Sequence, residues 1–513
     1  MRFDKVAAVV AGLSVLAGAA TPAFAQSLGR KMDLLRLQEQ AGTVAVAVLQ
    51  SEGGACAAQL PVMKTILADP RFDRLDAEAR RPFLYSVMLC AEVKDLPMAL
   101  AAADRLEPLA SEPSEIVAIY SVRMSDALQR EDRKGAATRF LALAELQPAA
   151  VAGWEPEMLA PFAGDDLGDP ALSLKLLQRI TSLAWTSSAS RRAAANEWAL
   201  AYGRRLADAG RADEAGKAVE KADDLYVRLM IAGDRRFAAL WDRYEGEGRF
   251  DWKALAEVEL ARARAAMDES PDQLRPVQDA LVALRALARY DEAIQIGEAY
   301  RARLQDGEAF EDAGGQAPLV MIALAQSLFE TGRAAEAEAV FRETLAREAR
   351  APSIDTAMAW AHRQLDLGRD REALTTLDAI DRDYMTPYGR LWLDSLRVCA
   401  QAEIDPKAAD ATLATVRQGQ ADNPGAVSQA LLCLNRVDEA AALLAERLAS
   451  PEHRAGGLDP YWVTLPPPHV TPRRAEFERR RQAMLAHPVS LKALAAVGRK
   501  VEAPLAGDYW GGF

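Results

Sequence analysis

The sequence is poor in sheet-forming residues and lacks long apolar runs. Aromatic side chains make up only 6% of the 513 residues, and the β-branched alternation typical of strands is missing throughout. Beyond the N-terminus, no stretch approaches the ~18 to 20 apolar residues that a membrane span requires. Acidic residues outnumber basic ones, 74 to 62, which argues against a nucleic-acid partner. We therefore expect an all-α chain without a later membrane anchor.

Catalytic and metal-binding motifs are also missing. The chain contains no His-Glu-x-x-His, Gly-x-Ser-x-Gly or EF-hand pattern. Carboxylates are plentiful but fall in the first turns of expected helices and on their solvent faces. The sequence thus predicts no enzyme, no catalytic residues, no metal and no cofactor, and a small-molecule ligand is not expected. The four histidines are too scattered for a metal or acid–base site: His362, His453, His469 and His487.

The N-terminus has the order of features found in a secretory signal. Arg2 and Lys5 precede an apolar run, and the small-residue site Ala23-Phe-Ala25 follows. Residues 1–25 are therefore predicted to be a cleavable signal peptide, and the mature chain starts at Gln26. An uncleaved N-terminal membrane anchor is the alternative. The predicted location is the periplasm, or the medium if the chain is secreted.

Four cysteines in an exported chain are expected to form disulfides. Cys56 and Cys90 are 34 residues apart, and so are Cys399 and Cys433. This matched spacing favours the two local pairings among the three possible connectivities. Four buried free thiols are the alternative.

A short phrase recurs at steps close to the period of two-helix repeats. It consists of a helix end, a small turn residue, a polar or Arg residue, and then an acidic residue followed by Ala, which opens a second helix. Gly or Asn at the turn permits a left-handed helix cap. The acidic residue favours the positive end of the second helix, and the Ala allows two helices to approach closely. The copies are Gly210 to Ala215, Ala288 to Ala293, Gly332 to Ala337, Gly368 to Ala373 and Asn435 to Ala440.

This pattern resembles the tetratricopeptide family. The large-small pairs Tyr202-Gly203, Leu324-Ala325 and Trp360-Ala361 match the first helix of that family's repeat. The sequence departs from the family at Glu403, which replaces a turn glycine, and at Gly297, which replaces an aromatic residue. The resemblance is strong for residues 196–450 and weak for 30–195. It implies a right-handed α-solenoid of antiparallel helix pairs and says little about function.

Breaks in the repeat pattern predict the domain organisation. Gly- and Pro-rich stretches interrupt the helices near residue 165 and again after Ser450, where no helix is expected up to Pro472. The expected segments are a signal peptide at 1–25, divergent helical repeats at 26–165, tetratricopeptide-like repeats at 166–450, a Pro-rich linker at 451–472, and a basic helical cap and tail at 473–513.

Two surfaces are candidates for binding. The first helices of successive repeats line the concave face in such a solenoid, which suits an extended peptide or a partner helix. A solvated face without a ligand is the alternative. The candidate residues on this face are Gln326, Asp355, Met358, His362, Asp366, Arg390 and Arg397.

The second surface is the basic C-terminal stretch. Eight Lys and Arg residues against two Glu residues could dock an anionic partner, or could cap the acidic body of the solenoid. The basic residues are Arg473, Arg474, Arg479, Arg480, Arg481, Lys492, Arg499 and Lys500.

The leading functional expectation is a non-enzymatic periplasmic scaffold or adaptor that binds a protein or peptide partner of the cell envelope. A module that binds an envelope polymer or glycan through the basic segment is the second reading. An enzyme with an unrecognised site is the third.

Overall fold

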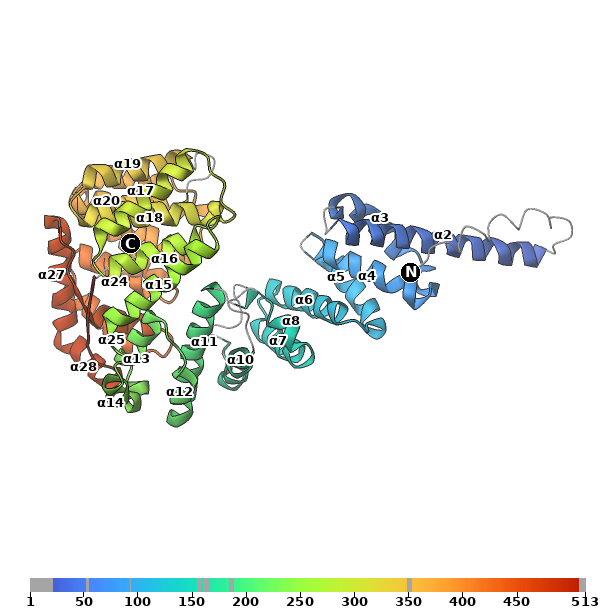
Figure 1. Ribbon diagram of the computed structural model, residues 1–513, viewed down its shortest axis with the longest axis horizontal. Helices are drawn as coiled ribbons and strands as arrows, with labels where there is room; N and C mark the ends of the chain where they lie inside the picture. The colour runs from blue at the N-terminus through green and yellow to red at the C-terminus, as the bar shows by residue number, and fades with distance from the viewer. Residues whose placement is uncertain are drawn as a thin grey trace. The chain divides into compact units, whose positions relative to one another are not determined.

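The computed structural model describes residues 22–51, 55–92, 94–154, 158–159, 167–183, 189–347 and 353–506 (Figure 1). The chain divides into two compact units, Met1–Arg192 and Ala193–Phe513. The sequence pattern had placed this boundary near residue 165. The difference arises because α10, which follows that break, packs against α7 and so belongs to the first unit.

The first unit is a succession of helices packed on their chain neighbours. Its core includes Phe72 and Phe83, whose ring centroids lie 5.2 Å apart. Its helices are α2 (Pro22–Gln50), α3 (Cys56–Ala68), α4 (Ala77–Ala91), α5 (Leu96–Leu106), α6 (Pro113–Gln129), α7 (Arg133–Leu146), α8 (Pro148–Val151) and α10 (Pro170–Ser182), with the 3-10 turns η1 (Phe72–Arg74) and η2 (Glu107–Leu109).

The second unit packs its helices in pairs. Side chains at helix starts accept backbone hydrogen bonds, as Ser353 does from Thr356 and Asn423 from Ala426. The helices are α11 (Ala189–Asp208), α12 (Ala212–Val219), α13 (Leu225–Gly233), α14 (Ala238–Gly246), α15 (Trp252–Glu269), α16 (Arg275–Ala286), α17 (Tyr290–Gln305), α18 (Ala313–Glu330), α19 (Ala334–Arg347), α20 (Ile354–Asp366), α21 (Asp370–Asp378), α22 (Pro387–Ile404), α23 (Pro406–Gln418), α24 (Pro424–Cys433) and α25 (Val437–Ala449), with η4 (Arg235–Phe237) and η5 (Arg382–Tyr384).

The recurring sequence phrase forms the turn inside a helix pair. All five predicted turn residues have left-handed backbone angles, from φ 55° at Asn435 to 81° at Gly332. At each turn the following Arg donates its N–H to a carbonyl five residues back, as Arg333 does to Leu328 at 2.8 Å. The Ala of each phrase is fully buried. The phrase therefore encodes a helix cap and a close helix contact, as predicted.

An ion pair that recurs in each copy of the phrase explains why Arg follows the turn residue in this chain. The Arg side chain reaches the Glu three residues later, which lies in the first turn of the second helix. The pair distance is 2.6 Å for Arg211 with Glu214 and 2.7 Å for Arg333 with Glu336. It lengthens to 3.8 Å for Arg436 with Glu439. Because this ion pair is exposed, it adds little stability.

One row of helices runs through the second unit. Helices α16, α18, α20, α22 and α24 each contact the next member of the series, and each also contacts the helix that follows it in the chain. We call these five helices the first-helix row, because each is the first helix of its pair. Its members come from the same sequence positions that the resemblance assigns to the concave face.

The segment after α25 folds back onto the second unit. We call residues 451–506 the C-terminal segment. It contains α26 (Arg454–Leu458), the 3-10 turn η6 (Asp459–Tyr461), β1 (Trp462–Leu465), α27 (Pro472–Ala486), α28 (Pro488–Val497) and β2 (Val501–Ala506). The expectation that residues 451–472 hold no helix is wrong for α26, where a five-residue helix forms despite two glycines.

The two strands form a small parallel sheet. Trp462 pairs with Val501 and Leu465 with Ala506, with an irregularity between Val463 and Leu465. The described residues are otherwise helical or irregular, so the all-α prediction is confirmed at the level of fold class. The strands were missed because four and six residues are too few for their alternation to be recognised in a sequence.

Both predicted disulfides are confirmed. Cys56–Cys90 joins α3 to α4 in the first unit, and Cys399–Cys433 joins α22 to α24 in the second. Each bridge ties together helices that are near neighbours in the chain. Paired cysteines are typical of proteins that fold in an oxidising compartment.

Most of the predicted signal peptide lies outside the described residues. These begin at Pro22, and side-chain positions are described from residue 31 onward. Within the described part of the chain, no helix combines the length and apolar character that crossing a membrane requires.

Candidate functional site

The C-terminal segment covers the first-helix row. Helix α27 contacts α20 and α24 of the row, and α28 packs against α25. Between β1 and α27, the backbone N–H of His469 donates to the carbonyl of Glu330 at the end of α18, at 2.9 Å. Strand β2 contacts α13, α15 and α16. The segment therefore touches the row at α16, α18, α20 and α24.

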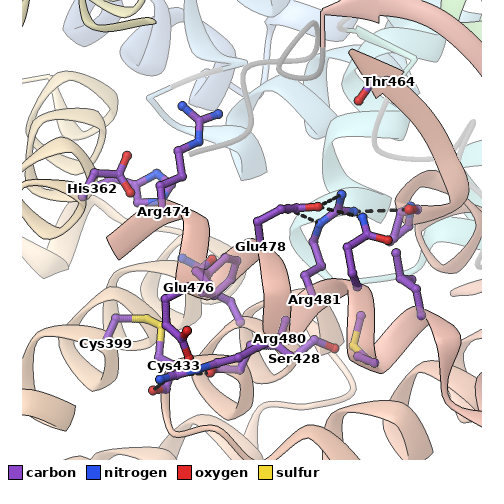
Figure 2. A pocket seen from close by; sticks show the side chains of 18 of the residues that line it. His362, Cys399, Ser428, Cys433, Thr464, Arg474, Glu476, Glu478, Arg480 and Arg481 are labelled. Carbon is purple, nitrogen blue, oxygen red and sulfur yellow. Dashed lines mark hydrogen bonds and ion pairs between the residues drawn. A yellow bond between two sulfur atoms is a disulfide. The ribbon is translucent and has the colours of Figure 1, made fainter. Parts of the chain in front are cut away.

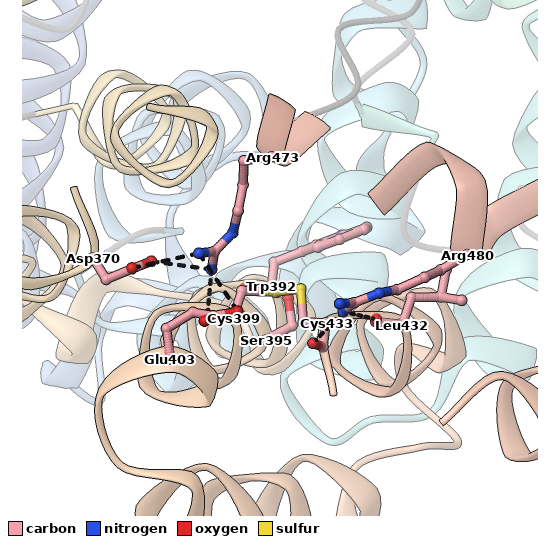
Figure 3. Close-up of a disulfide and its surroundings, with 9 residues drawn as sticks. All are labelled: Asp370, Trp392, Ser395, Cys399, Glu403, Leu432, Cys433, Arg473 and Arg480. Atoms are coloured by element: carbon pink, nitrogen blue, oxygen red, sulfur yellow. Dashed lines mark hydrogen bonds and ion pairs between the residues drawn. A yellow bond between two sulfur atoms is a disulfide. The ribbon is translucent and has the colours of Figure 1, made fainter. Parts of the chain in front are cut away.

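The basic residues of α27 make specific contacts with the row. Arg473 approaches Asp370 at 3.1 Å and donates to the carbonyl of Cys399 at 3.3 Å. Arg480 donates to the carbonyls of Leu432 and Cys433, at 3.1 and 2.8 Å, where α24 ends. Figure 3 shows these two arginines reaching down on either side of the Cys399–Cys433 disulfide. Positive groups at the end of a helix complement its partial negative charge.

The remaining basic residues divide into engaged and exposed groups. Arg481 pairs with Glu478 at 2.7 Å and donates to the carbonyl of Pro460 at 3.2 Å. Arg499 donates to the carbonyl of Ala232 at 2.8 Å and lies over the ring of Trp241. Arg474 is half-buried, whereas Arg479, Lys492 and Lys500 are exposed. Of the two sequence-based interpretations, docking onto the body therefore describes Arg473, Arg480 and Arg499, whereas Arg481 is engaged within the C-terminal segment.

The residues predicted to line an open concave face have different environments. Gln326, Met358 and Asp366 are buried, so the expectation that they are openly displayed is wrong. Gln326 accepts a hydrogen bond from Arg285 at 2.6 Å, and Asp366 pairs with Arg363 at 3.0 Å. The first pair joins the neighbouring row helices α16 and α18, and the second lies within α20.

The other four predicted residues are accessible to different degrees. Asp355 is exposed, and His362, Arg390 and Arg397 are half-buried. Arg397 is engaged with Asp378 at 2.6 Å. Of all seven predicted residues, His362 and Asp366 line a cavity between the first-helix row and the C-terminal segment, and the other five do not.

A cavity of about 630 Å³ lies between the C-terminal segment and the first-helix row (Figure 2). Its floor comes from α20, α22 and α24, with Trp392 and the Cys399–Cys433 disulfide among the lining residues. One wall is α27, including Arg474, Glu478 and Arg481. The opposite wall is the stretch 459–467, which includes β1.

Burial shifts the pKa of two groups in the cavity wall. Burial raises the pKa of Asp459 to about 7, against the pull of the nearby guanidiniums of Arg204 and Arg447. Burial also lowers the pKa of Arg447, whose Nη2 donates to the carbonyl of Gly456 at 2.6 Å. Three wall residues carry a buried polar atom without a hydrogen-bond partner among the described residues: Arg447 at Nε, Asp459 at Oδ1 and Trp462 at Nε1.

The sequence did not reveal this cavity. Its floor could be anticipated from the repeat, but its walls come from residues that the sequence assigned to a linker and a tail. The predicted row residues His362 and Asp366 and the excess of arginines between Arg473 and Arg481 pointed to the region. Within the described residues, no group of three or more His, Cys, Asp or Glu side chains is arranged to hold a metal ion.

Comparison with known proteins assigns neither a family nor a function to the chain. No protein-family model matches the chain, and no curated protein matches it.

Proposed function

We propose that this chain is a non-enzymatic periplasmic adaptor that binds protein partners of the cell envelope. In this proposal its second unit is a tetratricopeptide-like, right-handed array of antiparallel helix pairs. The left-handed turns at all five copies of the phrase and the buried Ala of every copy support that assignment.

The observation that carries the proposal is the occupation of the first-helix row by α27. Tetratricopeptide-like arrays offer this row as a binding surface for peptides and helices. Here the row accepts a basic helix of the same chain through the carbonyls of Cys399, Leu432 and Cys433, and Asp370 at the start of the neighbouring α21 adds an ion pair. A surface that holds a segment of its own chain by side-chain and carbonyl contacts has the chemistry needed to hold segments of other proteins.

The polymer-binding alternative has less support. It requires basic side chains that are free to meet an anionic polymer, but Arg473, Arg480, Arg481 and Arg499 are engaged within the unit. The exposed remainder, Arg479, Lys492 and Lys500, does not lie on one helix. Loss of polymer co-sedimentation on changing these three to Gln would favour the alternative.

Site-specific photo-crosslinking in cells of the source organism tests the adaptor proposal. A photoreactive residue at Val470, which is exposed and borders the cavity, should capture one defined protein. The matched control is Val258, which is similarly exposed on α15 but does not border the cavity. Capture of no protein from Val470, or equal capture from both sites, would count against an adaptor. Turnover of an envelope substrate by the purified chain would refute the non-enzymatic assignment.

A further inference from the structure

The cavity borders one edge of strand β1. All nine consecutive residues from Asp459 to Pro467 line it, including every residue of β1. Side chains of a strand alternate between its two faces, so a cavity on one face would be lined by every second residue. No residue of β2 lines the cavity, which places the opening along the edge of β1 opposite β2. Thr464 is labelled on this strand in Figure 2, across the opening from Glu478 and Arg481.

This edge is open in the part of the chain that the structure describes. The sheet has two strands, so β1 pairs on one side only. An open strand edge presents backbone N–H and C=O groups that can pair with another strand, and proteins usually protect such edges with charges or prolines. Here the residues Val463 and Leu465 are 43% and 44% exposed. Val470, beyond the strand, is also exposed and lines the same cavity. The open edge of β1 therefore combines exposed apolar side chains with backbone groups to which another strand can pair.

The charges around the cavity favour an acidic group in the occupant. Most carboxylates of the wall have an Arg partner: Asp366 pairs with Arg363, Glu403 with Arg473, Glu476 with Arg480 and Glu478 with Arg481. Two cations of the wall, Arg447 and Lys500, have no ion-pair partner among the described residues. Asp459 is protonated in a large fraction of molecules near neutral pH, and so offsets only part of this charge.

We propose that the open edge of β1 binds an extended segment of a partner protein as an added strand. The segment alternates apolar residues, which face Val463 and Leu465, and carries an Asp or Glu that reaches Arg447 or Lys500. This inference rests on the proposed adaptor function and names the part of the partner that is recognised. Binding by strand addition draws its affinity from main-chain hydrogen bonds and its selectivity from alternate side chains.

A peptide selection on the full chain tests the inference. The probe is a random dodecapeptide library displayed on phage, enriched on the immobilised protein with its disulfides intact. Enriched sequences should alternate apolar residues and contain at least one acidic residue. Their affinity, measured by fluorescence anisotropy of the synthetic peptides, should fall at least tenfold for the Val463→Lys, Leu465→Lys double variant.

The control is the double variant Val489→Lys, Leu491→Lys. These residues are 46% and 39% exposed on α28 and do not line the cavity. The control should bind the selected peptides like the wild type, which separates loss of the site from a general effect of two added lysines. Failure to enrich any peptide that discriminates between the two double variants would overturn the inference.

N-methylation of the peptide distinguishes strand addition from other binding modes. Only every second amide of an added strand faces β1, so methylating one alternate set should abolish binding and the other set should not. Equal losses from both sets would refute strand addition. Binding that arises only after residues 507–513 are deleted would also refute it, since the chain's own end would then be the occupant.

The outcome can be separated from the fate of the adaptor proposal. If Val470 captures a protein in cells but the selected peptides ignore the Val463 and Leu465 changes, strand addition is wrong and the adaptor proposal stands. If Val470 captures no protein, the adaptor proposal itself fails.

Discussion

At the scale of single residues, the turn positions show how directly the sequence encodes geometry in this chain. Three of the five predicted turn residues are glycines, which adopt positive φ without steric cost. Ala288 and Asn435 adopt the same conformation at φ 56° and 55°. An L-residue with a Cβ is strained there, by about 1 to 2 kcal/mol for alanine. The strain at Ala288 is tolerated because the flanking helices fix the turn.

We predict that Ala288→Gly stabilises the second unit by about 0.5 to 1 kcal/mol, because it relieves this strain. Gly368→Ala should have the opposite effect of similar size, since φ is 72° and no neighbouring atom would contact the added Cβ. Chemical denaturation of the two variants measures both effects. Destabilisation by Ala288→Gly would show that the turn is not left-handed in solution.

Asp459 gives a prediction about pH. Its pKa is raised from 3.8 to about 7 in the folded chain, so the folded state retains a proton that the unfolded state releases between these values. Stability contributed by the protonated group is therefore complete below pH 4, declines as the pH rises toward 7, and stays low above it. The Asp459→Asn variant should lack this decline. Its free energy of unfolding relative to the wild type should therefore increase by roughly 2 kcal/mol between pH 5 and pH 8.

Urea unfolding at several pH values, followed by hydrogen exchange in the second unit, measures that difference. Asp422→Asn serves as the control because Asp422 is exposed. A constant difference between Asp459→Asn and the wild type across this pH range would contradict the prediction.

At the scale of elements, the helices of the second unit were predictable, including a helical basic segment after Pro472, but the place where the C-terminal segment docks was not. The turn phrase carries the local signals for a helix end, a tight turn and a helix start, so five helix pairs could be located from it. Pro318 lies inside α18, although proline locally disfavours the interior of a helix. Tertiary packing overrides the local preference there, because eleven of the eighteen residues of α18 are buried.

The position of the C-terminal segment escaped prediction because it depends on contacts distant in sequence. Trp252 donates from Nε1 to the carbonyl of Glu502 at 2.8 Å, and Arg499 donates its backbone N–H to the carbonyl of Gly233 at 2.9 Å. No periodicity or motif encodes such pairings. The excess of arginine indicated a surface that needs negative partners, but it could not show that these were Asp370 and helix-end carbonyls of the same chain.

Gly498 tests this docking. A Cβ at this position would lie 2.3 Å from the carbonyl oxygen of Gly233 and 2.6 Å from Leu458. Backbone cannot yield as a flexible side chain can, so Gly498→Ala should displace the end of the segment and cost about 1 to 3 kcal/mol. Hydrogen exchange should become faster in β1 and β2.

Gly315→Ala is the matched control for Gly498→Ala. Gly315 lies in α18, where an added Cβ meets no atom within 4 Å, so the change should be neutral or stabilising. Unchanged exchange in β1 and β2 for Gly498→Ala would show that the segment is not docked as described.

At the scale of the whole molecule, each unit has its own core and its own disulfide. Cys56–Cys90 lies in the first unit and Cys399–Cys433 in the second. Each closes a loop across 34 residues, and such closure is worth about 3 to 4 kcal/mol in the chain-entropy description.

We predict that replacing Cys399 and Cys433 with Ala destabilises the second unit by about 2 to 4 kcal/mol and leaves the first unit unchanged. Replacing Cys56 and Cys90 should have the reverse pattern. Hydrogen exchange followed by mass spectrometry reads the two units separately in one experiment. Equal destabilisation of both units by either pair of changes would show that they unfold together.

The docked C-terminal segment changes the order in which this chain can complete its folding. Helical repeat arrays ordinarily gain structure pair by pair, because each repeat touches only its neighbours. Here β2 packs on α13, α15 and α16, so early helices of the second unit acquire contacts from residues far later in the chain. A nascent second unit thus remains incomplete until residue 506 has emerged.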